Sequence, residues 1–460
     1  SGSCAGNPFD LTIQVNPIPE IADKTVAICS EVFFVVSPVD GFVNGNGAVD
    51  IVPAGTTYTW VVIPNNNVTG ESSVSIAQNS ISQQLTNTTN TVQTVFYTVT
   101  PRSGATGNCI GLPFQVSVQV DPKPFVQTIN ETVCSDSPFT ISPANGNGNI
   151  VPAGTTYTWT FVDNPDVTGE ATGTAAANFT QTLSNTTTSP QTVTYTVTPT
   201  SGDSGNCQGD PFTINITVNP TPVIADITDA ICSNSSFSVT PQDGGANIVP
   251  AGTRYSWTVT PNANVEGESD QTTAQPLISQ FLRNTTNTVQ TVLYQVTPTL
   301  GNCTGATFQV AITVNPTPEI DNDTAIICSG DPFSVTPING GNNIVPTGTT
   351  YTWTVAPNAN VTGQSDVNVG QNAISQTLTN TSNTVQTVIY TVTPISGAAG
   401  SCTGQTFNVT VTVNPRPSIV NETIEACSNA PINYTATHGD NNNIVPTNTQ
   451  YTWVIKTDNN

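Results

Sequence analysis

The ten cysteines have the clearest capacity for covalent chemistry in this chain, and their spacing is regular. Cysteines at fixed positions in a chain with few charged residues indicate disulfides and an oxidising, extracellular compartment. No Cys-x-x-Cys motif occurs and His438 is the only histidine, which disfavours a Cys/His metal site. Five cysteine pairs share one identical spacing: Cys4 and Cys29, Cys109 and Cys134, Cys207 and Cys232, Cys303 and Cys328, and Cys402 and Cys427.

Two pairing schemes fit this spacing. Scheme one closes each repeat on itself and leaves Cys4 and Cys427 for residues outside this piece. Its bonds are Cys29–Cys109, Cys134–Cys207, Cys232–Cys303 and Cys328–Cys402. Scheme two joins the five equally spaced pairs, which requires a sharp chain reversal within each pair. In a simple sandwich the two cysteines of scheme one lie at opposite ends, although bonded Cα atoms must lie within about 7 Å. We favour scheme one, on the assumption that the first strand is short or bent.

Other chemistry is sparse. A single histidine removes most Ser-His and Cys-His mechanisms, and neither Gly-x-Ser-x-Gly nor a phosphate-binding glycine loop occurs. We therefore predict no catalytic residues, no enzyme activity and no cofactor. Calcium is the strongest cofactor candidate, because oxygen ligands are abundant, yet the acidic positions shift between repeats and no EF-hand spacing exists. The candidate ligands are Asp40, Asp50, Asp243, Asp321, Asp323 and Asp440.

The composition limits the partners. The chain has 30 acidic and 7 basic residues, a net charge of −23, and only 8% charged residues. Nucleic acids and anionic membranes both require clusters of Lys and Arg, so neither is an expected partner. No hydrophobic run is long enough for a transmembrane helix, and we expect no membrane insertion in this segment. The chain starts and stops within a repeat, which indicates an internal piece of a longer protein.

The five tryptophans repeat with nearly the same period as the cysteines. Trp60, Trp159, Trp257, Trp353 and Trp453 recur at nearly equal intervals. A period of about 98 residues is long enough for each repeat to bury its own core, unlike the shorter units of solenoids. We expect an incomplete repeat at 1–16 (its last strand), complete repeats at 17–121, 122–219, 220–315 and 316–414, and the start of another at 415–460.

The sequence of one repeat serves to predict the fold of all the complete repeats. In residues 316–414, alternating apolar and β-branched runs predict six or seven short strands and no helix. Seven strands with a tryptophan on the third are typical of an immunoglobulin-like β-sandwich. We therefore predict an all-β tandem array of such sandwiches, forming an elongated rod, with the tryptophans in the cores. The joints have the pattern Asn/Asp-Pro-x-Pro, which favours a short, stiff, extended linker.

Several short segments resemble a known class of repeats. The segments Ile-Cys-Ser-Gly-Asp-Pro-Phe (327–333), Tyr-Thr-Trp (351–353) and Val-Asn-Pro-Arg-Pro (413–417) resemble the PKD-like and Ig-like repeats of secreted Bacteroidetes surface proteins. More narrowly, they resemble SprB-type gliding-motility adhesins, which are exported by type IX secretion. The usual PKD motif Trp-x-Phe-Gly-Asp-Gly is missing, because Trp353 is followed by Thr-Val-Ala-Pro. The resemblance implies long cell-surface filaments and supplies no catalytic residues.

Two functions follow as expectations. The first is a structural stalk of a secreted, cell-surface adhesin filament that supports surface attachment and gliding motility. Its partners would be an extracellular substratum or polysaccharide, contacted by other parts of the protein, and the motility and secretion machinery. The second is a set of carbohydrate-binding repeats, or accessory modules of a secreted polysaccharide-degrading protein, which would require exposed aromatic residues.

Overall fold

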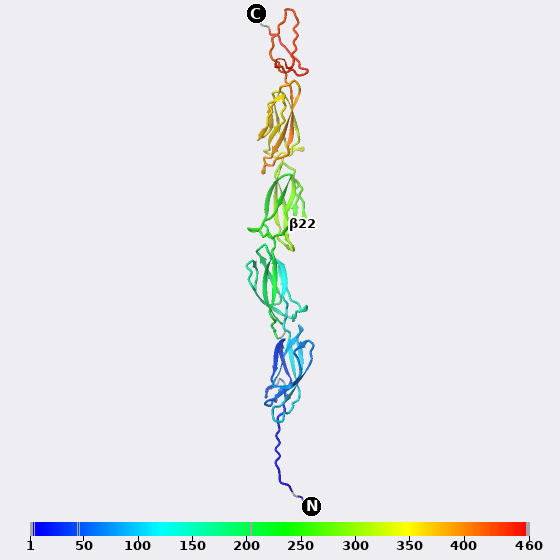
Figure 1. Cartoon of the computed structure of the whole chain (residues 1–460), viewed down its shortest axis with the longest axis vertical. Helices are drawn as coiled ribbons and strands as arrows, with labels where there is room; N and C mark the ends of the chain where they lie inside the picture. Colours follow the sequence, from blue (N-terminus) through cyan, green and yellow to red (C-terminus); the bar gives the residue numbers. More distant parts are fainter. Residues whose placement is uncertain (1–2, 4, 44, 46, 203–204, 457–460) are drawn as a thin grey trace. The chain divides into compact units, whose positions relative to one another are not determined.

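The structure is a computed structural model that describes residues 3, 5–43, 45, 47–202 and 205–456. These residues fold as four successive β-sandwiches, as the repeats predict (Figure 1). The chain divides into two compact units, Ser1–Thr221 and Pro222–Asn460, and each unit contains two of the sandwiches. The only helical element in the described part of the chain is a short 3-10 turn, η1 (Asp440–Asn442).

The first unit holds sandwiches 1 and 2. Sandwich 1 consists of β1 (Lys24–Cys29), β2 (Val32–Val36), β3 (Thr57–Ile63), β4 (Val68–Thr69), β5 (Val74–Gln78), β6 (Ile81–Asn87), β7 (Gln93–Arg102) and β8 (Phe114–Asp121). Sandwich 2 consists of β9 (Ile129–Cys134), β10 (Pro138–Ile141), β11 (Thr156–Phe161), β12 (Val167–Thr168), β13 (Gly173–Ala176), β14 (Phe179–Thr182), β15 (Ser184–Asn185), β16 (Gln191–Thr200) and β17 (Phe212–Asn219).

The second unit holds sandwiches 3 and 4. Strand β22, which is labelled in Figure 1, belongs to sandwich 3. Sandwich 3 consists of β18 (Ile227–Cys232), β19 (Ser235–Val239), β20 (Arg254–Thr260), β21 (Val265–Glu266), β22 (Gln271–Gln275), β23 (Ile278–Asn284), β24 (Gln290–Leu300), β25 (Cys303–Thr304) and β26 (Phe308–Asn315). Sandwich 4 consists of β27 (Asp323–Cys328), β28 (Pro332–Val335), β29 (Thr350–Val355), β30 (Val361–Thr362), β31 (Val367–Gln371), β32 (Ile374–Thr377), β33 (Thr379–Asn380), β34 (Gln386–Ile395) and β35 (Phe407–Asn414).

Each sandwich packs a larger sheet against a smaller one. In sandwich 1 the strand orders are β1-β8-β7-β3-β5 and β2-β6-β4, and sandwich 3 has the same order with β25 added beside β24. In sandwiches 2 and 4 the larger sheet keeps this order, whereas the smaller one is divided into two-stranded pairs, β10-β14 and β12-β15 in sandwich 2 and β28-β32 and β30-β33 in sandwich 4. The strand after the tryptophan strand is split: its weakly patterned sequence forms two short strands, β4 and β5, on different sheets. The core lies between the sheets because alternate residues point inward. On β8, for example, Phe114, Val116, Val118 and Val120 are all buried.

The first strand of each sandwich pairs with the last strand in parallel, whereas the other pairings are antiparallel. In sandwich 1, β1 runs beside β8 with Lys24 opposite Val116 and Cys29 opposite Asp121. The same register recurs where Cys134 lies opposite Asn219, Cys232 opposite Asn315 and Cys328 opposite Asn414. Both strands therefore run toward the same end of their sandwich, and the cysteine at the end of the first strand lies beside the joint to the next repeat.

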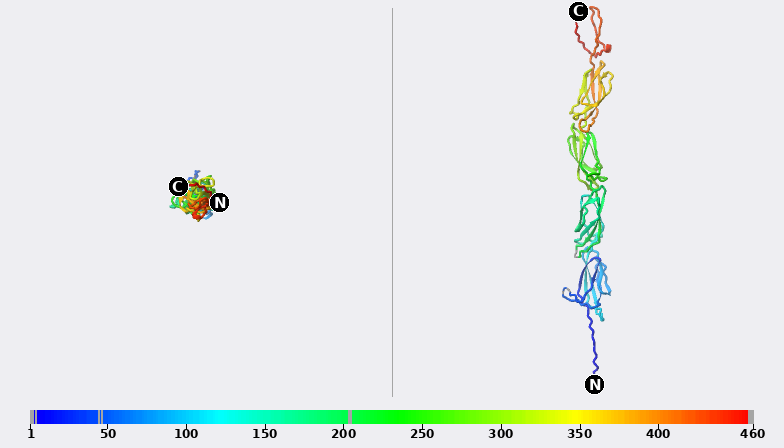
Figure 2. Two further views of the ribbon diagram at one scale, coloured as in Figure 1. Left: turned by 90° about the horizontal axis from the view of Figure 1, so that it is seen from above. Right: turned by 90° about the vertical axis from the view of Figure 1, so that its left-hand side faces the viewer.

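The two end segments differ from the prediction. Phe9, Leu11, Ile13 and Val15 alternate as in a last strand, but the described residues of 1–16 form no strand and these four side chains are exposed. Residues 415–456 also contain no strand (Figure 2). Their one ladder contact is an isolated bridge between Ser418 and Ile444. A strand needs a hydrogen-bonded neighbour, so an alternating pattern alone does not produce one.

Candidate functional site

The joint between successive sandwiches is where the chain's reactive and charged side chains meet. Cys29, at the end of β1 in sandwich 1, forms a disulfide with Cys207 in the loop between β16 and β17 of sandwich 2, with a Cα–Cα distance of 5.6 Å. Cys232 of sandwich 3 forms the equivalent bond with Cys402 of sandwich 4, at 5.7 Å. Cys134 and Cys303, at the corresponding repeat positions, are also disulfide-bonded. Within each unit, a disulfide thus connects one sandwich to the next.

Scheme one is therefore wrong. Because β1 is parallel to β8, Cys29 lies beside Asp121 at the far end of β8, while Cys109 precedes Phe114 at its near end. The eight residues of β8 span about 26 Å at roughly 3.3 Å per residue, well beyond the limit of about 7 Å for bonded Cα atoms. The same geometry excludes the other predicted bonds. The contradicted bonds are Cys29–Cys109, Cys134–Cys207, Cys232–Cys303 and Cys328–Cys402.

Scheme two is also wrong. Cys109, Cys328 and Cys427 are free thiols, whereas scheme two would bond each of them across a joint. Cys4 lies outside the described residues. The sequence did contain a signal for the observed pairing, because the two cysteines of each repeat were predicted at opposite ends. Opposite ends of successive repeats meet at a joint, which brings cysteines of neighbouring repeats together.

A glycine of sandwich 2 packs tightly against the linker that joins sandwiches 1 and 2. Gly209, two residues after Cys207, packs against the backbone carbonyl of Pro124 and the ring of Pro199, and an added Cβ would overlap with both. Its N–H donates to the carbonyl oxygen of Pro199 at 2.9 Å. Pro124 is the second proline of the Pro-x-Pro linker. The linker is therefore held by contact with the loop that carries the disulfide, in addition to its own stiffness. Equivalent glycines are Gly111, Gly305 and Gly404.

The middle residue of Pro-x-Pro makes a polar contact back to the preceding sandwich. Lys123 forms ion pairs with Glu31 of sandwich 1 at 2.8 Å and with Asp210 of sandwich 2 at 3.0 Å. The hydrogen bond to Glu31 is the main cause of the raised pKa of Lys123. At the same position, Thr317 donates to the carbonyl oxygen of Ser233 at 3.2 Å. The middle residue of the linker thus contacts the preceding sandwich at both joints, although it is lysine in one and threonine in the other.

The joint between sandwiches 3 and 4 has a further ion pair. Nη2 of Arg283 in sandwich 3 lies 2.9 Å from Glu319 of sandwich 4, and Asn234 of sandwich 3 also donates to Glu319. The hydrogen bond from Arg283 holds the pKa of Glu319 below its usual value. Beyond sandwich 4, Arg416 pairs with Asp331 at 2.9 Å. Only 8% of the residues in this chain are charged, so the ion pairs found at several joints indicate that these joints are specifically stabilised.

A buried asparagine braces the inside of each sandwich near the joint. The Nδ2 of Asn185 donates to the carbonyl oxygens of Ser189 and Val218, both at 2.8 Å. Its Oδ1 accepts from the backbone N–H and the hydroxyl of Thr187. This asparagine begins an Asn-x-Thr glycosylation motif, but the side chain is only 2% exposed. Asn87, Asn284 and Asn380 have the same role.

Four of the five tryptophans are core residues, as predicted. Trp60, Trp159, Trp257 and Trp353 are buried, and each indole N–H donates to a backbone carbonyl. Trp453 differs, because it is 83% exposed in the strand-free segment 415–456. The first four cannot stack on a sugar ring.

The candidate calcium ligands are used as hydrogen-bond acceptors within loops. Asp50 is buried, pairs with Lys24 at 2.6 Å and accepts from the N–H of Ala22. Asn149 occupies the same repeat position and accepts from the N–H of Gln127 through its Oδ1. Either residue supplies the required oxygen, which explains why acidic positions shift between repeats. Asp40, Asp243, Asp321 and Asp323 likewise accept hydrogen bonds.

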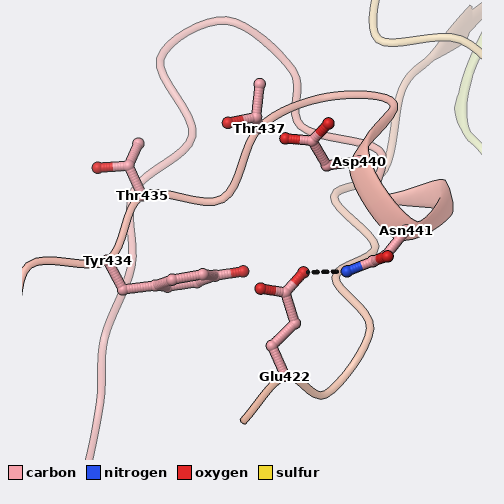
Figure 3. A pocket seen from close by; sticks show the side chains of 6 residues that line it. All are labelled: Glu422, Tyr434, Thr435, Thr437, Asp440 and Asn441. Carbon is pink, nitrogen blue, oxygen red and sulfur yellow. Dashed lines mark hydrogen bonds between the residues drawn. The ribbon is translucent and has the colours of Figure 1, made fainter. Parts of the chain in front are cut away.

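No three His, Cys, Asp or Glu side chains among the described residues are grouped so that they could hold a metal ion. Asp440 lines a shallow pocket in segment 415–456, together with Glu422, Tyr434 and Asn441 (Figure 3). Glu422 accepts from Nδ2 of Asn441 at 2.8 Å, and this bond lowers the pKa of Glu422. The pocket is open to solvent. His438 is exposed nearby.

Comparison with known proteins gives the fold family. Within the described residues, no helix is long and apolar enough to cross a membrane. No curated protein matches the chain. Similar solved structures include the human desmocollin-1 ectodomain (11% identity, 89% of this chain and 84% of that one, TM-score 0.26). Another is the titin I-band fragment I67–I69 (8% identity, 64% and 96%, TM-score 0.27).

The family model described as "PKD-like domain" matches residues 39–124, 131–222, 229–318 and 325–417. Each match covers most of one sandwich and ends in or just after an Asn/Asp-Pro-x-Pro linker. The four matches together account for most of the chain, and the missing Trp-x-Phe-Gly-Asp-Gly motif does not prevent them. This chain therefore belongs to the PKD-like domain family, as a tandem array of four such domains.

Proposed function

We propose that this chain is part of the structural stalk of a long, secreted cell-surface adhesin, which supports surface attachment and gliding motility. The observation that carries the proposal is the disulfide between neighbouring sandwiches, seen as Cys29–Cys207 and Cys232–Cys402. A covalent bond between two domains limits how far they can move apart or bend relative to each other. A spacer that carries load would need this restriction at its joints.

The joint contacts support the same role. The linker between sandwiches 1 and 2 is short and proline-rich, and Gly209 packs against the carbonyl oxygen of its Pro124. Lys123 forms ion pairs with both of these sandwiches. Such contacts restrict bending at the joint between sandwiches 1 and 2. The disulfides also fit an extracellular location, since cytosolic thiols are kept reduced. In this role the adhesive ligand would be bound by other parts of the protein.

The carbohydrate-binding alternative has weaker support. Sugar-binding surfaces usually present aromatic side chains at repeated, exposed positions. Here the repeated tryptophans are buried, while exposed aromatic residues such as Phe42 and Phe281 have no aromatic counterpart in the other repeats. Phe42 is instead in contact with the Lys24 ammonium group, 4.7 Å from the ring centroid.

The test uses the full-length surface protein in its own cells. Deletion of sandwiches 2 and 3 together, from residue 122 to residue 315, should leave the protein on the surface and reduce attachment while its ligand preference stays the same. Electron microscopy should show shorter filaments. The purified chain should bind no glycan on an array. Saturable glycan binding by the purified chain, or unchanged attachment with a changed ligand preference after the deletion, would contradict the stalk role.

A further inference from the structure

The disulfides create a covalent path through the array that is far shorter than the backbone. From Cys29 the path crosses to Cys207, follows the chain to Cys232, and crosses to Cys402. We call the stretch from Cys207 to Cys232 the step segment. The two bridges enclose the rest of the chain between Cys29 and Cys402 in closed loops, with sequence separations of 178 and 170. Only the step segment therefore remains outside these loops.

We propose that this path is a tension-bearing tether, which fixes the maximum length of the array even when its sandwiches unfold. Tension applied at the two ends passes through the shortest covalent route. Residues inside a closed loop carry little of it once the route is taut. The inference goes beyond the proposed stalk role, because it holds for the isolated chain whatever surface that chain serves.

Much of the step segment is already extended in the folded protein. It contains β17 (Phe212–Asn219) at the end of sandwich 2, the Pro-x-Pro linker, and β18 (Ile227–Cys232) at the start of sandwich 3. Strands rise about 3.3 Å per residue, near the limit of a stretched chain. Fully stretched, the step segment reaches roughly 85 Å, whereas the whole backbone from Cys29 to Cys402 would reach roughly 1,200 Å. Unfolding of the sandwiches therefore adds little length to the path.

The length pattern of the sequence supports this interpretation. The enclosed loops differ in length, at 178 and 170, and the tryptophan intervals vary between repeats. The spacing from the loop cysteine to the next strand cysteine is the same at every joint, from Cys4–Cys29 to Cys402–Cys427. Loop insertions normally cost little free energy, so a constant spacing requires a separate cause. A load-bearing segment supplies that cause, because an insertion there would lengthen the tether.

The parallel pairing at the joint also suits a tensile role. β17 pairs with β9 in parallel, from Ile214 beside Ile129 to Asn219 beside Cys134. β9 lies inside the closed loop from Cys29 to Cys207, so it carries little tension itself. Its hydrogen bonds hold β17 extended while β17 carries the tension. The β17 part of the step segment is thus held along its length within sandwich 2.

Single-molecule force spectroscopy of the full chain, held by tags at both termini, tests the proposal. The oxidised protein should show no sandwich-sized extension step between Cys29 and Cys402. Addition of a phosphine reductant under load should release extensions on the order of 300 Å, the stretched length of about 98 residues. Sandwich-sized extensions in the oxidised protein, at the same forces as in the reduced one, would overturn the tether.

Two variants assign the effect to the bridge. Cys207→Ser removes the first bridge, so sandwich 1 should become load-bearing and add at least one extension without reductant. Cys109→Ser is the matched control, because Cys109 is the cysteine at the same repeat position and is a free thiol, so its trace should match the wild type. If Cys207→Ser does not fold, the comparison of oxidised and reduced wild-type protein still tests whether the bridges carry the tension. Identical traces for folded Cys207→Ser and wild type would refute the proposal.

Discussion

Cys29 is bonded to Cys207, a residue of the next sandwich, although Cys109 is the second cysteine of its own sandwich. The reason is the parallel pairing of β1 with β8, which takes Cys29 to the end of the sandwich that faces the joint. The loop cysteine of the following repeat lies at the same joint. A bond between repeats thus results from strand direction.

Disulfide mapping checks the pairing directly. Proteolysis without reduction, followed by mass spectrometry, should yield linked peptides for Cys29–Cys207 and Cys232–Cys402. Cys109, Cys328 and Cys427 should react with an alkylating reagent before reduction, since all three are free thiols. A Cys29–Cys109 peptide would contradict the structure.

The contact of Gly209 with the linker predicts a large effect from one methyl group. Gly209→Ala should destabilise the first unit by about 1–3 kcal/mol, because the added Cβ has no room beside the Pro124 carbonyl and the Pro199 ring. Gly45→Ala is the control, since a Cβ there meets nothing within 4 Å. Urea unfolding of both variants measures the difference. Equal stabilities would mean that the linker is not packed as described.

The buried asparagine should be essential to its sandwich. Asn185→Ala leaves the carbonyl oxygens of Ser189 and Val218 without their donor, and we expect a loss of about 3 kcal/mol. Asn178→Ala, at an exposed Asn-x-Thr motif, should change stability by less than about 0.5 kcal/mol. Thermal unfolding gives both values. Comparable losses at the two positions would argue against a bracing role.

Two equivalent tyrosines offer a matched test of a buried hydrogen bond. The Tyr294 hydroxyl donates to the side chain of Gln280 at 2.9 Å, whereas the Tyr195 hydroxyl has no hydrogen-bond partner among the residues that the structure describes. Tyr294→Phe should cost about 1 kcal/mol, because Gln280 loses its donor. Tyr195→Phe should be neutral or stabilising. Chemical denaturation compares the two variants, and a larger loss for Tyr195→Phe would be inconsistent with these contacts.

The Arg283–Glu319 ion pair gives the joint between sandwiches 3 and 4 a dependence on pH. The pKa of Glu319 is lowered by the hydrogen bond from Arg283, so folding favours the charged form. This stabilisation is present above the unfolded pKa, near 4.3, and is lost as the pH falls through the lower folded pKa. Both side chains are partly exposed, so the contribution should be below about 1 kcal/mol.

Glu319→Gln isolates that contribution. At pH 7 the variant should be slightly less stable than the wild type, and the two should converge as the pH falls below the folded pKa of Glu319. Added salt at pH 7 should also reduce the difference, because it screens partly exposed charges. Unfolding curves measured from pH 2 to pH 7 provide the comparison. A difference that grows toward low pH would have the wrong sign.

Much of the fold could be predicted from local patterns. The alternation around Trp353 predicted its strand, and the run from Phe407 to Val413 predicted the last strand, because side-chain direction alternates along any strand. The buried position of Trp353 followed from the same alternation. Strand partners did not follow. The split of Val361–Val369 between two sheets depends on contacts with strands distant in the sequence.

The end segments show the same limit. Leu11, Ile13 and Val15 have the alternation of a strand and still form none in the described residues. Trp453 has the local sequence of the four core tryptophans and is exposed. The alternation of apolar and polar residues determines which face of a strand would be buried. That face is buried only where a second sheet packs against it.

By itself, the sequence determined the repeat, the all-β class, the core tryptophans of the four complete sandwiches, and the constant cysteine spacing at each joint, since these depend on composition and spacing along one chain. Only the tertiary structure decided which cysteines bond and which sandwich each bond connects. A disulfide depends on the distance between two Cα atoms in space, and that distance is set by the direction of β1 relative to β8 and by the end of the neighbouring sandwich that meets it.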